Sequence, residues 1–276
     1  MSAALAHASS VPYPRRVAAA SPDIPFGEPS LRDGFAAAVI DMHIHSRGAS
    51  SDSMLDPELL PALAESSGLS GVNISEHDQV WDRHRQAEYR AEHPGFFSNF
   101  AMEVSTDLGH MLAIGLEVYE SGIHRADRLR AAVDRVGGYL IVAHPFRHVF
   151  DPVTAMRTGA KPFDLTPEQA AVLPVFRVVD AVEIANACNT PRENYFAAEV
   201  ASIAGLPGTG GSDAHSESGI GYFATGFERS VTDAEGLVTE LHAGRFEAVH
   251  RTRGGRLVRF EPGSIEAAQR SEAASG

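Results

Sequence analysis

Two histidines separated by one residue, His43 and His45, open the part of the sequence whose residue types could do chemistry. They lie in DMHIHS (41–46), and an extended chain points residues two apart to the same side, so both imidazoles could share one metal ion. A second pair at this spacing, Asp213 and His215, follows a glycine turn in GSDAH (211–215). One such pair is a weak signal, because ordinary surface and core histidines also occur at this spacing.

Other histidines and carboxylates stand at the ends of apolar runs along the chain. They occur in SEHD (75–78), MEVS (102–105), HMLAIG (110–115) and AHPF (143–146), and are His77, Glu103, His110 and His144. If they were ordinary core residues, their convergence would leave buried polar groups unpaired. We therefore predict a metal site with nitrogen and oxygen ligands, which suit Zn²⁺, Mn²⁺ or Fe²⁺. The single cysteine, Cys188, excludes an internal disulfide and a thiolate zinc cluster.

Seven motifs, HIH, SEHD, MEVS, GHMLAIG, AHP, VEIAN and GSDAH, occur in an order that resembles the PHP (polymerase and histidinol phosphatase) family of metal-dependent phosphoesterases. The likeness runs from about residue 38 to about residue 250. It implies an α/β fold, a distorted (β/α)7 barrel in a single domain, with two or three divalent ions. The implied ligands are His43, His45, Glu103 and Asp213 for the first ion, Glu103, His110 and His144 for the second, and His77, His215 and Asp52 for the third.

The sequence departs from the family pattern at RGASSDS (47–53), which is about two residues longer than usual between the HxH pair and the aspartate. Asp52 is therefore either a ligand or a turn aspartate. We expect Glu76 and Asp78 to orient His77. Asn186 either touches the substrate or caps the helix that begins near Pro191, and we favour capping.

The resemblance also implies a mechanism, in which Glu103 bridges two ions roughly 3.5 to 4 Å apart, with a shared hydroxide as the nucleophile. Asp213 would help to hold the ions. The leaving alkoxide needs a proton or a cation, and the candidates are Arg147, His148, His215 or a metal-bound water. Arg147 is either a phosphate clamp or a plain surface arginine.

The predicted substrate is a small phosphomonoester, such as a nucleotide or histidinol phosphate. A net charge of -13, with no run of lysine or arginine, argues against extended nucleic-acid binding. Two other functions stay open: hydrolysis of a C–N or C–O bond on the same fold, and metal binding without catalysis. The oligomeric state stays open as well.

Repeated βα units must position these residues, because from residue 37 short apolar runs alternate with helical patterns. The predicted strands are 37–43, 71–77, 100–105, 110–116, 139–145, 181–187 and 206–213. The predicted helices are 56–68, 82–92, 124–136, 167–173, 191–204 and 232–243.

The chain divides into one domain with two tails. Residues 1–35 lack the apolar core of a secretory signal and are predicted to be a loosely ordered extension. Residues 36–262 form the hydrolase domain, and 263–276 a flexible tail. The stretch 148–178 carries four prolines and is predicted to be a lid, or alternatively a floppy insertion. No apolar run is long enough to cross a bilayer, so we expect a cytoplasmic protein.

Overall fold

The structure, a computed structural model, describes residues 36–151, 153, 157, 163–252 and 255–262. The predicted N-terminal extension (1–35) and C-terminal tail (263–276) lie outside the described residues. The predicted lid at 148–178 lies partly outside them. Its described part contains a short helix, α5 (Pro167–Ala171), and a 3-10 turn, η2 (Pro174–Arg177).

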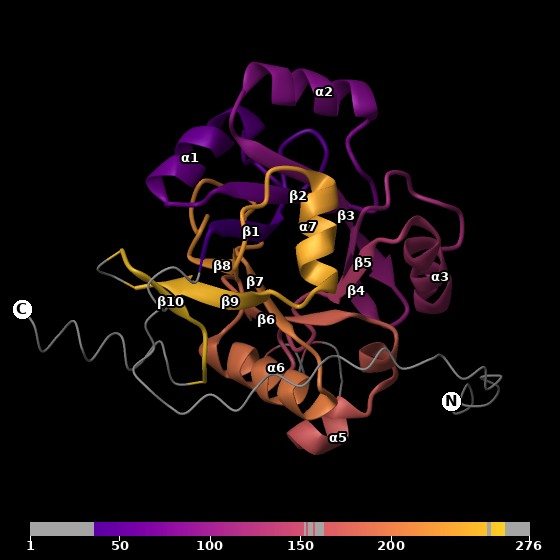
Figure 1. The fold of residues 1–276 in the computed structure, drawn as a ribbon. Coiled ribbons are helices and arrows are strands. Elements are labelled where there is room, and N and C mark those ends of the chain that lie inside the picture. Colours follow the sequence, from indigo (N-terminus) through magenta and orange to yellow (C-terminus); the bar gives the residue numbers. More distant parts are fainter. Residues whose placement is uncertain (1–35, 152, 154–156, 158–162, 253–254, 263–276) are drawn as a thin grey trace, which may run out of the picture.

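One mixed sheet of ten strands forms the centre of the described part of the chain (Figure 1). In space the strands follow the order β10-β9-β8-β1-β2-β3-β4-β5-β6-β7. Their bounds are β1 Ala38–Ile44, β2 Gly71–His77, β3 Phe97–Thr106, β4 Gly109–Ile114, β5 Tyr139–Val142, β6 Ala181–Asn186, β7 Gly208–Gly211, β8 Phe223–Phe227, β9 Phe246–Arg251 and β10 Leu257–Arg259.

Parallel pairing of the first three strands brings their polar ends to one edge. β1 pairs in parallel with β2, and β2 with β3. All of β1 is buried, with Ile40 and Met42 on one side and Asp41 and His43 on the other. Gly71 allows β2 to approach β3 closely, because a Cβ there would lie 2.4 Å from the carbonyl oxygen of Phe97.

Helices cover the outside of the curled sheet, with α1 and α2 at the top of Figure 1, α3 at the right, and α5 and α6 at the bottom. Their bounds are α1 Leu60–Ser66, which follows the 3-10 turn η1 Pro57–Leu59, α2 Arg83–Glu92, α3 Ala126–Val136, α6 Pro191–Ala204 and α7 Ala234–His242. Thr190 starts α6 with a capping box, in which its hydroxyl accepts from the backbone N–H of Glu193. Gly137, in the left-handed region, ends α3.

The sheet curls until the end of β7 reaches β1, and we call this contact the β1–β7 seam (residues 41–45 and 211–214). Asp213 donates its backbone N–H to the carbonyl of His43 at 2.7 Å, and His45 donates to the carbonyl of Ala214 at 3.0 Å. Gly211 is needed here because a Cβ would lie 2.6 Å from the Cβ of His43. The seam therefore places the two pairs of residues with this spacing, His43 with His45 and Asp213 with His215, side by side.

A buried carboxylate ties the seam together. Asp41 is fully buried and accepts from the backbone N–H groups of Ser212 at 2.8 Å and Gly221 at 3.0 Å. Burial raises the pKa of Asp41 to about 6, although these hydrogen bonds oppose the shift.

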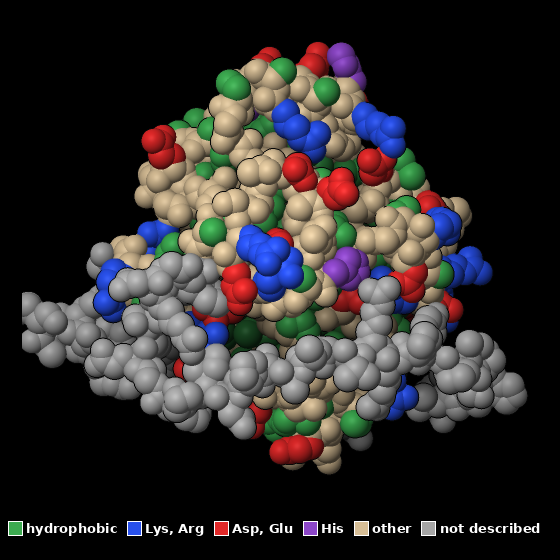
Figure 2. Space-filling view, viewed as in Figure 1, with side chains coloured by type: hydrophobic (Ala, Val, Ile, Leu, Met, Phe, Trp, Pro, Cys, Tyr) green, Lys and Arg blue, Asp and Glu red, His purple; other side chains and the backbone are tan. Residues whose placement is uncertain are grey.

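The predicted α/β class is confirmed, and each of the seven predicted strands overlaps an observed one. Strands β8, β9 and β10 were not predicted, and they extend the sheet beyond β1 by antiparallel pairing. Among the described residues, no helix combines the length and the apolar character that crossing a membrane requires. On the face shown in Figure 2, basic side chains are interspersed with acidic ones, so its described residues form no continuous basic band.

Candidate metal centre

Every strand from β1 to β5, and the segment after β7, contributes at least one predicted ligand to a single centre. These side chains come from the strands themselves or from the residues that directly follow them. They are His43 and His45 at the end of β1, His77 of β2, Glu103 of β3, His110 of β4, His144 after β5, and Asp213 and His215 after β7.

Four of these side chains surround one point, the predicted position of the first ion. His43 Nε2 and His45 Nε2 lie 3.0 Å apart. Asp213 Oδ1 lies 3.5 Å from His43 Nε2 and 3.2 Å from His45 Nε2. Glu103 Oε2 lies 3.5 Å and 3.3 Å from the same two nitrogens. The structure thus brings together the full set expected for the first ion.

The other oxygen of Glu103 faces a second group. Glu103 Oε1 lies 2.9 Å from His110 Nδ1 and 2.8 Å from His144 Nε2. These are the residues expected around the second ion. One buried carboxylate therefore presents its two oxygens to two different sets of nitrogen ligands.

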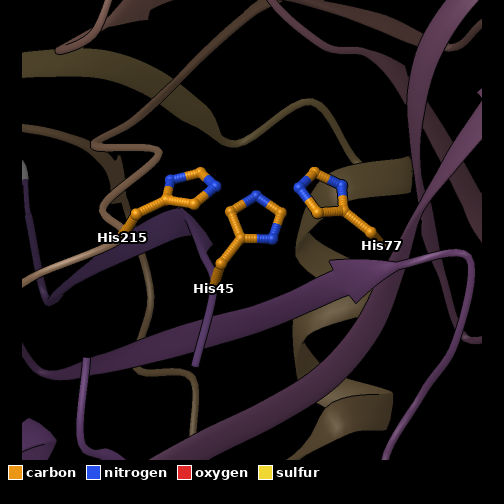
Figure 3. A group of neighbouring side chains, drawn as sticks. All are labelled: His45, His77 and His215. Atoms are coloured by element: carbon orange, nitrogen blue, oxygen red, sulfur yellow. The ribbon is translucent and has the colours of Figure 1, made fainter. Parts of the chain in front are cut away.

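A third group lies on the more exposed side of the centre. Figure 3 shows the rings of His45, His77 and His215 gathered together with His45 in the middle, and its ring centroid is 4.2 Å from that of His77 and 4.4 Å from that of His215. Asp52 Oδ2 lies 3.2 Å from His77 Nε2 and 3.3 Å from His215 Nε2. The longer loop at 47–53 thus still brings Asp52 opposite the two histidines expected to hold the third ion with it.

Glu183, on β6, is a site residue that we did not predict. Its carboxylate is fully buried, and it accepts from His43 Nδ1 at 3.0 Å, from the backbone N–H of His144 at 2.9 Å and from Asn186 Nδ2 at 2.9 Å. It therefore orients two candidate ligands at once. The available signal was an ionisable residue in the middle of the otherwise apolar run AVEIA (181–185).

The chemistry of these donors fits a bound cation. Because a carboxylate only accepts, the Nδ1 atom of His43 must carry a proton, and in the neutral ring Nε2 then keeps its lone pair. That lone pair faces His45 Nε2 and two carboxylate oxygens. Glu103 Oε2 is also buried without a hydrogen-bond partner. Such a convergence of electron pairs is stable only around a positive charge.

The pKa values of His43 and Glu103 in the metal-free site also indicate that a positive charge is stabilised there. Burial alone would lower the pKa of His43, but the charges of Asp213, Glu183 and Glu103 outweigh it and hold that pKa well above its usual range. Burial would likewise raise the pKa of Glu103, yet His43 and the hydrogen bonds from His110 and His144 hold it well below. Protons and metal ions thus compete for the same place.

Two of the candidate ligands have a strained backbone. His144 and Asp213 have φ angles of 29° and 55°, in the left-handed region that non-glycine residues rarely adopt. Such conformations cost about 1–3 kcal/mol each and persist only where the surroundings enforce them. Here the enforcing contacts are the bond from His144 N–H to Glu183 and the bond from Asp213 N–H to His43 across the seam.

Arg147 reaches the centre, but its guanidinium is already engaged by protein oxygens. Its Nη2 contacts Asp213 Oδ2 and donates to Asn186 Oδ1 at 2.8 Å, and its Nε donates to Asn189 Oδ1 at 3.0 Å. The side chain keeps 23% exposure. Arg147 is therefore not a plain surface arginine, and the contacts that the structure shows hold Asp213 in place.

The expectation that Asn186 caps α6 is wrong. The N-cap is Thr190, while Asn186 is fully buried and bonds Glu183 and Arg147. Cys188 is exposed, and its backbone N–H donates to Asn186 Oδ1.

Glu76 and Asp78 do not bond the ring of His77. The Asp78 side chain accepts from the backbone N–H of Ser105 at 2.9 Å, which ties the end of β2 to β3. Glu76 accepts from Trp81 Nε1 and from the segment after β1.

Comparison with known proteins gave one family match. Residues 191–246 match the family described as PHP-associated. This match confirms the resemblance to the PHP family. The matched segment holds α6, β7 and the PHP motif GSDAH, with Asp213 and His215. No curated protein matches the chain.

Solved structures resemble this chain at low identity. PsfC from Pseudomonas syringae gives a TM-score of 0.52 at 18% identity, over 87% of this chain and 99% of that one. A candidate metal-dependent phosphoesterase from Bifidobacterium adolescentis gives 0.49 at 20%, over 79% and 98%. An amidohydrolase from Chromobacterium violaceum, with bound sulfate and no metal, gives 0.49 at 15%, over 66% and 89%. The likeness to PsfC shows a shared fold.

Proposed function

We propose that the chain is a metal-dependent phosphoesterase that hydrolyses a small phosphomonoester, such as a nucleotide or histidinol phosphate. One observation carries this proposal: Glu103, buried and ionised, turns its two oxygens toward two separate sets of histidines. A bridging carboxylate of this kind holds two ions in dinuclear hydrolases.

Zn²⁺, Mn²⁺ and Fe²⁺ all suit these nitrogen and oxygen donors. When bound, two or three such ions supply an activated water and screen the negative charge of a phosphate group. They also bring positive charge to the centre of a chain whose net charge is -13.

The protein's own residues orient the reaction. Glu103, Asp213 and the histidines hold the ions, and Glu183 keeps the Nε2 lone pair of His43 directed at the first position. Arg147 holds Asp213 and stands at the edge of the centre, where a phosphate oxygen could be bound. His215 faces the exposed side and is the candidate donor of a proton to the leaving alkoxide.

We also propose a correspondence with the PHP barrel and a location. Strands β1 to β7 are neighbours in chain order, and β7 returns to β1 at the seam, so they correspond to the seven strands of the (β/α)7 barrel, with β8–β10 as an addition. The described residues between 36 and 262 then form one domain. A cytoplasmic location completes the proposal.

A metal analysis followed by a substrate panel tests the proposal. The purified protein is analysed for bound metals, reloaded with the metal found, and incubated with nucleotides, histidinol phosphate and p-nitrophenyl phosphate while inorganic phosphate is measured. We expect phosphate release that depends on the metal and is abolished in Asp213→Asn with an unchanged circular dichroism spectrum. Turnover confined to amides or lactones would assign the centre to C–N or C–O hydrolysis instead. No turnover of any substrate with bound metal would leave a non-catalytic metal site.

A further inference from the structure

Glu76, at the end of β2, is a buried carboxylate for which the proposed reaction has no direct use. It is fully buried and binds four donors. They are the backbone N–H of Ser46 at 3.1 Å, the hydroxyl of Ser46, the hydroxyl of Ser50 at 2.5 Å and Trp81 Nε1 at 3.0 Å. Because a carboxylate accepts and cannot donate, the proton of each of these groups must point at Glu76.

The hydrogen bonds of Ser50 then follow by elimination. A hydroxyl has one proton and two lone pairs, and the proton of Ser50 is given to Glu76. Ser50 Oγ also lies 3.2 Å from His45 Nδ1 and 3.3 Å from the backbone nitrogen of His77. Toward both of these groups it can only accept. The Nδ1 atom of His45 must therefore carry a proton.

This proton decides what His45 can bind. In the neutral ring with Nδ1 protonated, Nε2 holds the lone pair. That atom faces His43 Nε2, Glu103 Oε2 and Asp213 Oδ1, at the first ion position. If the ring carried its proton on Nε2 instead, His45 would present a hydrogen to the ion.

The same serine anchors the loop that carries Asp52. The loop is closed by backbone bonds from Ser50 N–H to the carbonyl of Ser46 at 3.1 Å and from Ser53 N–H to the carbonyl of Ser50 at 3.2 Å. Asp52 itself is 55% exposed, so burial does not fix its position. The bond from the Ser50 hydroxyl to Glu76 fixes the loop to β2 two residues before Asp52.

We propose that Glu76 and Ser50 form a positioning pair, which holds His45 with Nε2 toward the first ion and holds the 46–53 loop with Asp52 at the third. The pair acts on the ions through His45 and Asp52 and touches neither ion nor substrate. In its effect on metal binding, the proposal rests on the proposed function; in its effect on the ring of His45, it holds for the metal-free protein.

Two serine variants of the same carboxylate separate this role from simple packing. Ser50→Ala and Ser46→Ala each remove one hydroxyl from Glu76, but of these two hydroxyls only that of Ser50 lies against the ring of His45. These variants are preferable to Glu76→Gln, whose amide would point a donor at another donor in the core. The chain has one tryptophan, Trp81, so its fluorescence reports whether the surroundings of Glu76 stay intact in both variants.

The first measurement uses the metal-free protein. Long-range ¹H–¹⁵N spectra of the histidine rings, assigned with a His45→Gln variant, distinguish a proton on Nδ1 from one on Nε2. At a pH where the ring is neutral, we expect Nδ1–H for His45 in the wild type and in Ser46→Ala, and a mixture of both forms in Ser50→Ala. An unchanged His45 in Ser50→Ala, or an Nε2–H form in the wild type, overturns the positioning pair whatever the protein hydrolyses.

The second measurement is metal affinity by competition with a chelator, and metal content by elemental analysis. We expect Ser50→Ala to bind metal about 10- to 100-fold more weakly than the wild type, the usual effect of removing a partner behind a metal ligand, and Ser46→Ala to stay within about threefold. Equal weakening in both variants, or none in either, refutes the role in metal binding. A wild type that binds metal normally yet releases no phosphate refutes the proposed function alone.

Discussion

Replacing Glu183 by glutamine tests whether a carboxylate behind the ligands sets metal affinity. The substitution keeps the size of the side chain but turns one acceptor oxygen into an NH₂ donor. Glu183 Oε1 serves His43 Nδ1, and Oε2 serves the backbone N–H of His144 and the amide of Asn186. Either orientation of the glutamine therefore points a donor at a donor.

The two orientations have different costs. With its NH₂ toward His43, the glutamine forces the ring proton onto Nε2 and removes the lone pair from the first ion position. With its NH₂ toward His144, it leaves buried donors unsatisfied at about 1–3 kcal/mol each. We expect metal affinity to fall about 10- to 100-fold, which is about 1.4–2.7 kcal/mol, together with a lower free energy of unfolding.

The assay is a chelator competition, read beside a urea unfolding curve of the metal-free protein. Glu240→Gln serves as the matched control, because Glu240, on α7 and away from the centre, is also a buried glutamate and pairs with Arg245. We expect Glu240→Gln to lower the free energy of unfolding and to leave metal affinity unchanged. Metal affinity of Glu183→Gln within twofold of the wild type would refute the reasoning.

Three further predictions concern the same molecule. Arg147→Lys keeps the charge but loses the guanidinium, whose Nη2 contacts both Asp213 and Asn186. We expect weaker metal binding if the arginine only positions Asp213, and a raised KM at unchanged metal content if it clamps phosphate; steady-state kinetics with metal analysis separate the two. His250 is buried with neither ring nitrogen bonded, and burial lowers its pKa to about 4. Because the unfolded chain then binds the extra proton first, stability is lost as the pH falls from about 6.5 toward 4, by at most about 3 kcal/mol, and urea titrations should show a shallower pH dependence in His250→Leu. Metal removal should lower Tm, since a ligand at 1,000 times its Kd stabilises the folded state by about 4 kcal/mol; an unchanged Tm in EDTA contradicts a metal-bound folded state.

Most candidate ligands could be predicted because they lie in or next to strands whose apolar runs are plain in the sequence, whereas Asp52 lies in a loop. Strand β8 could not, since FATGF is short and contains Gly226 beside a loop rich in glycine. The role of Glu183 depends on its hydrogen bond with His43, 140 positions away, and no local sequence pattern shows that these two residues meet. The N-cap of α6 at Thr190 could have been predicted, because a threonine followed by a proline, with a glutamate three positions on, is a capping signal that the sequence carries.

The positioning pair of Glu76 and Ser50 illustrates a second limit of sequence reasoning. Glu76 adjoins His77 in the chain, so orientation of His77 was the natural expectation. In a strand, however, neighbouring side chains point to opposite sides, and Glu76 therefore faces the loop after β1. Sequence neighbours within a strand are poor candidates for direct contact.

The β1–β7 seam gives a bound ion a mechanical role. Ser212 and His43 meet there across 169 positions of sequence, with candidate ligands of the first ion on both sides. An ion at that position would be a reversible cross-link between the two strands and would close a very large loop. For a covalent cross-link, closing a loop of this length is worth roughly 5 kcal/mol in unfolded-chain entropy. Loss of the ion should therefore loosen the sheet first at this seam, where amide hydrogens of residues 41–45 and 211–214 would begin to exchange together.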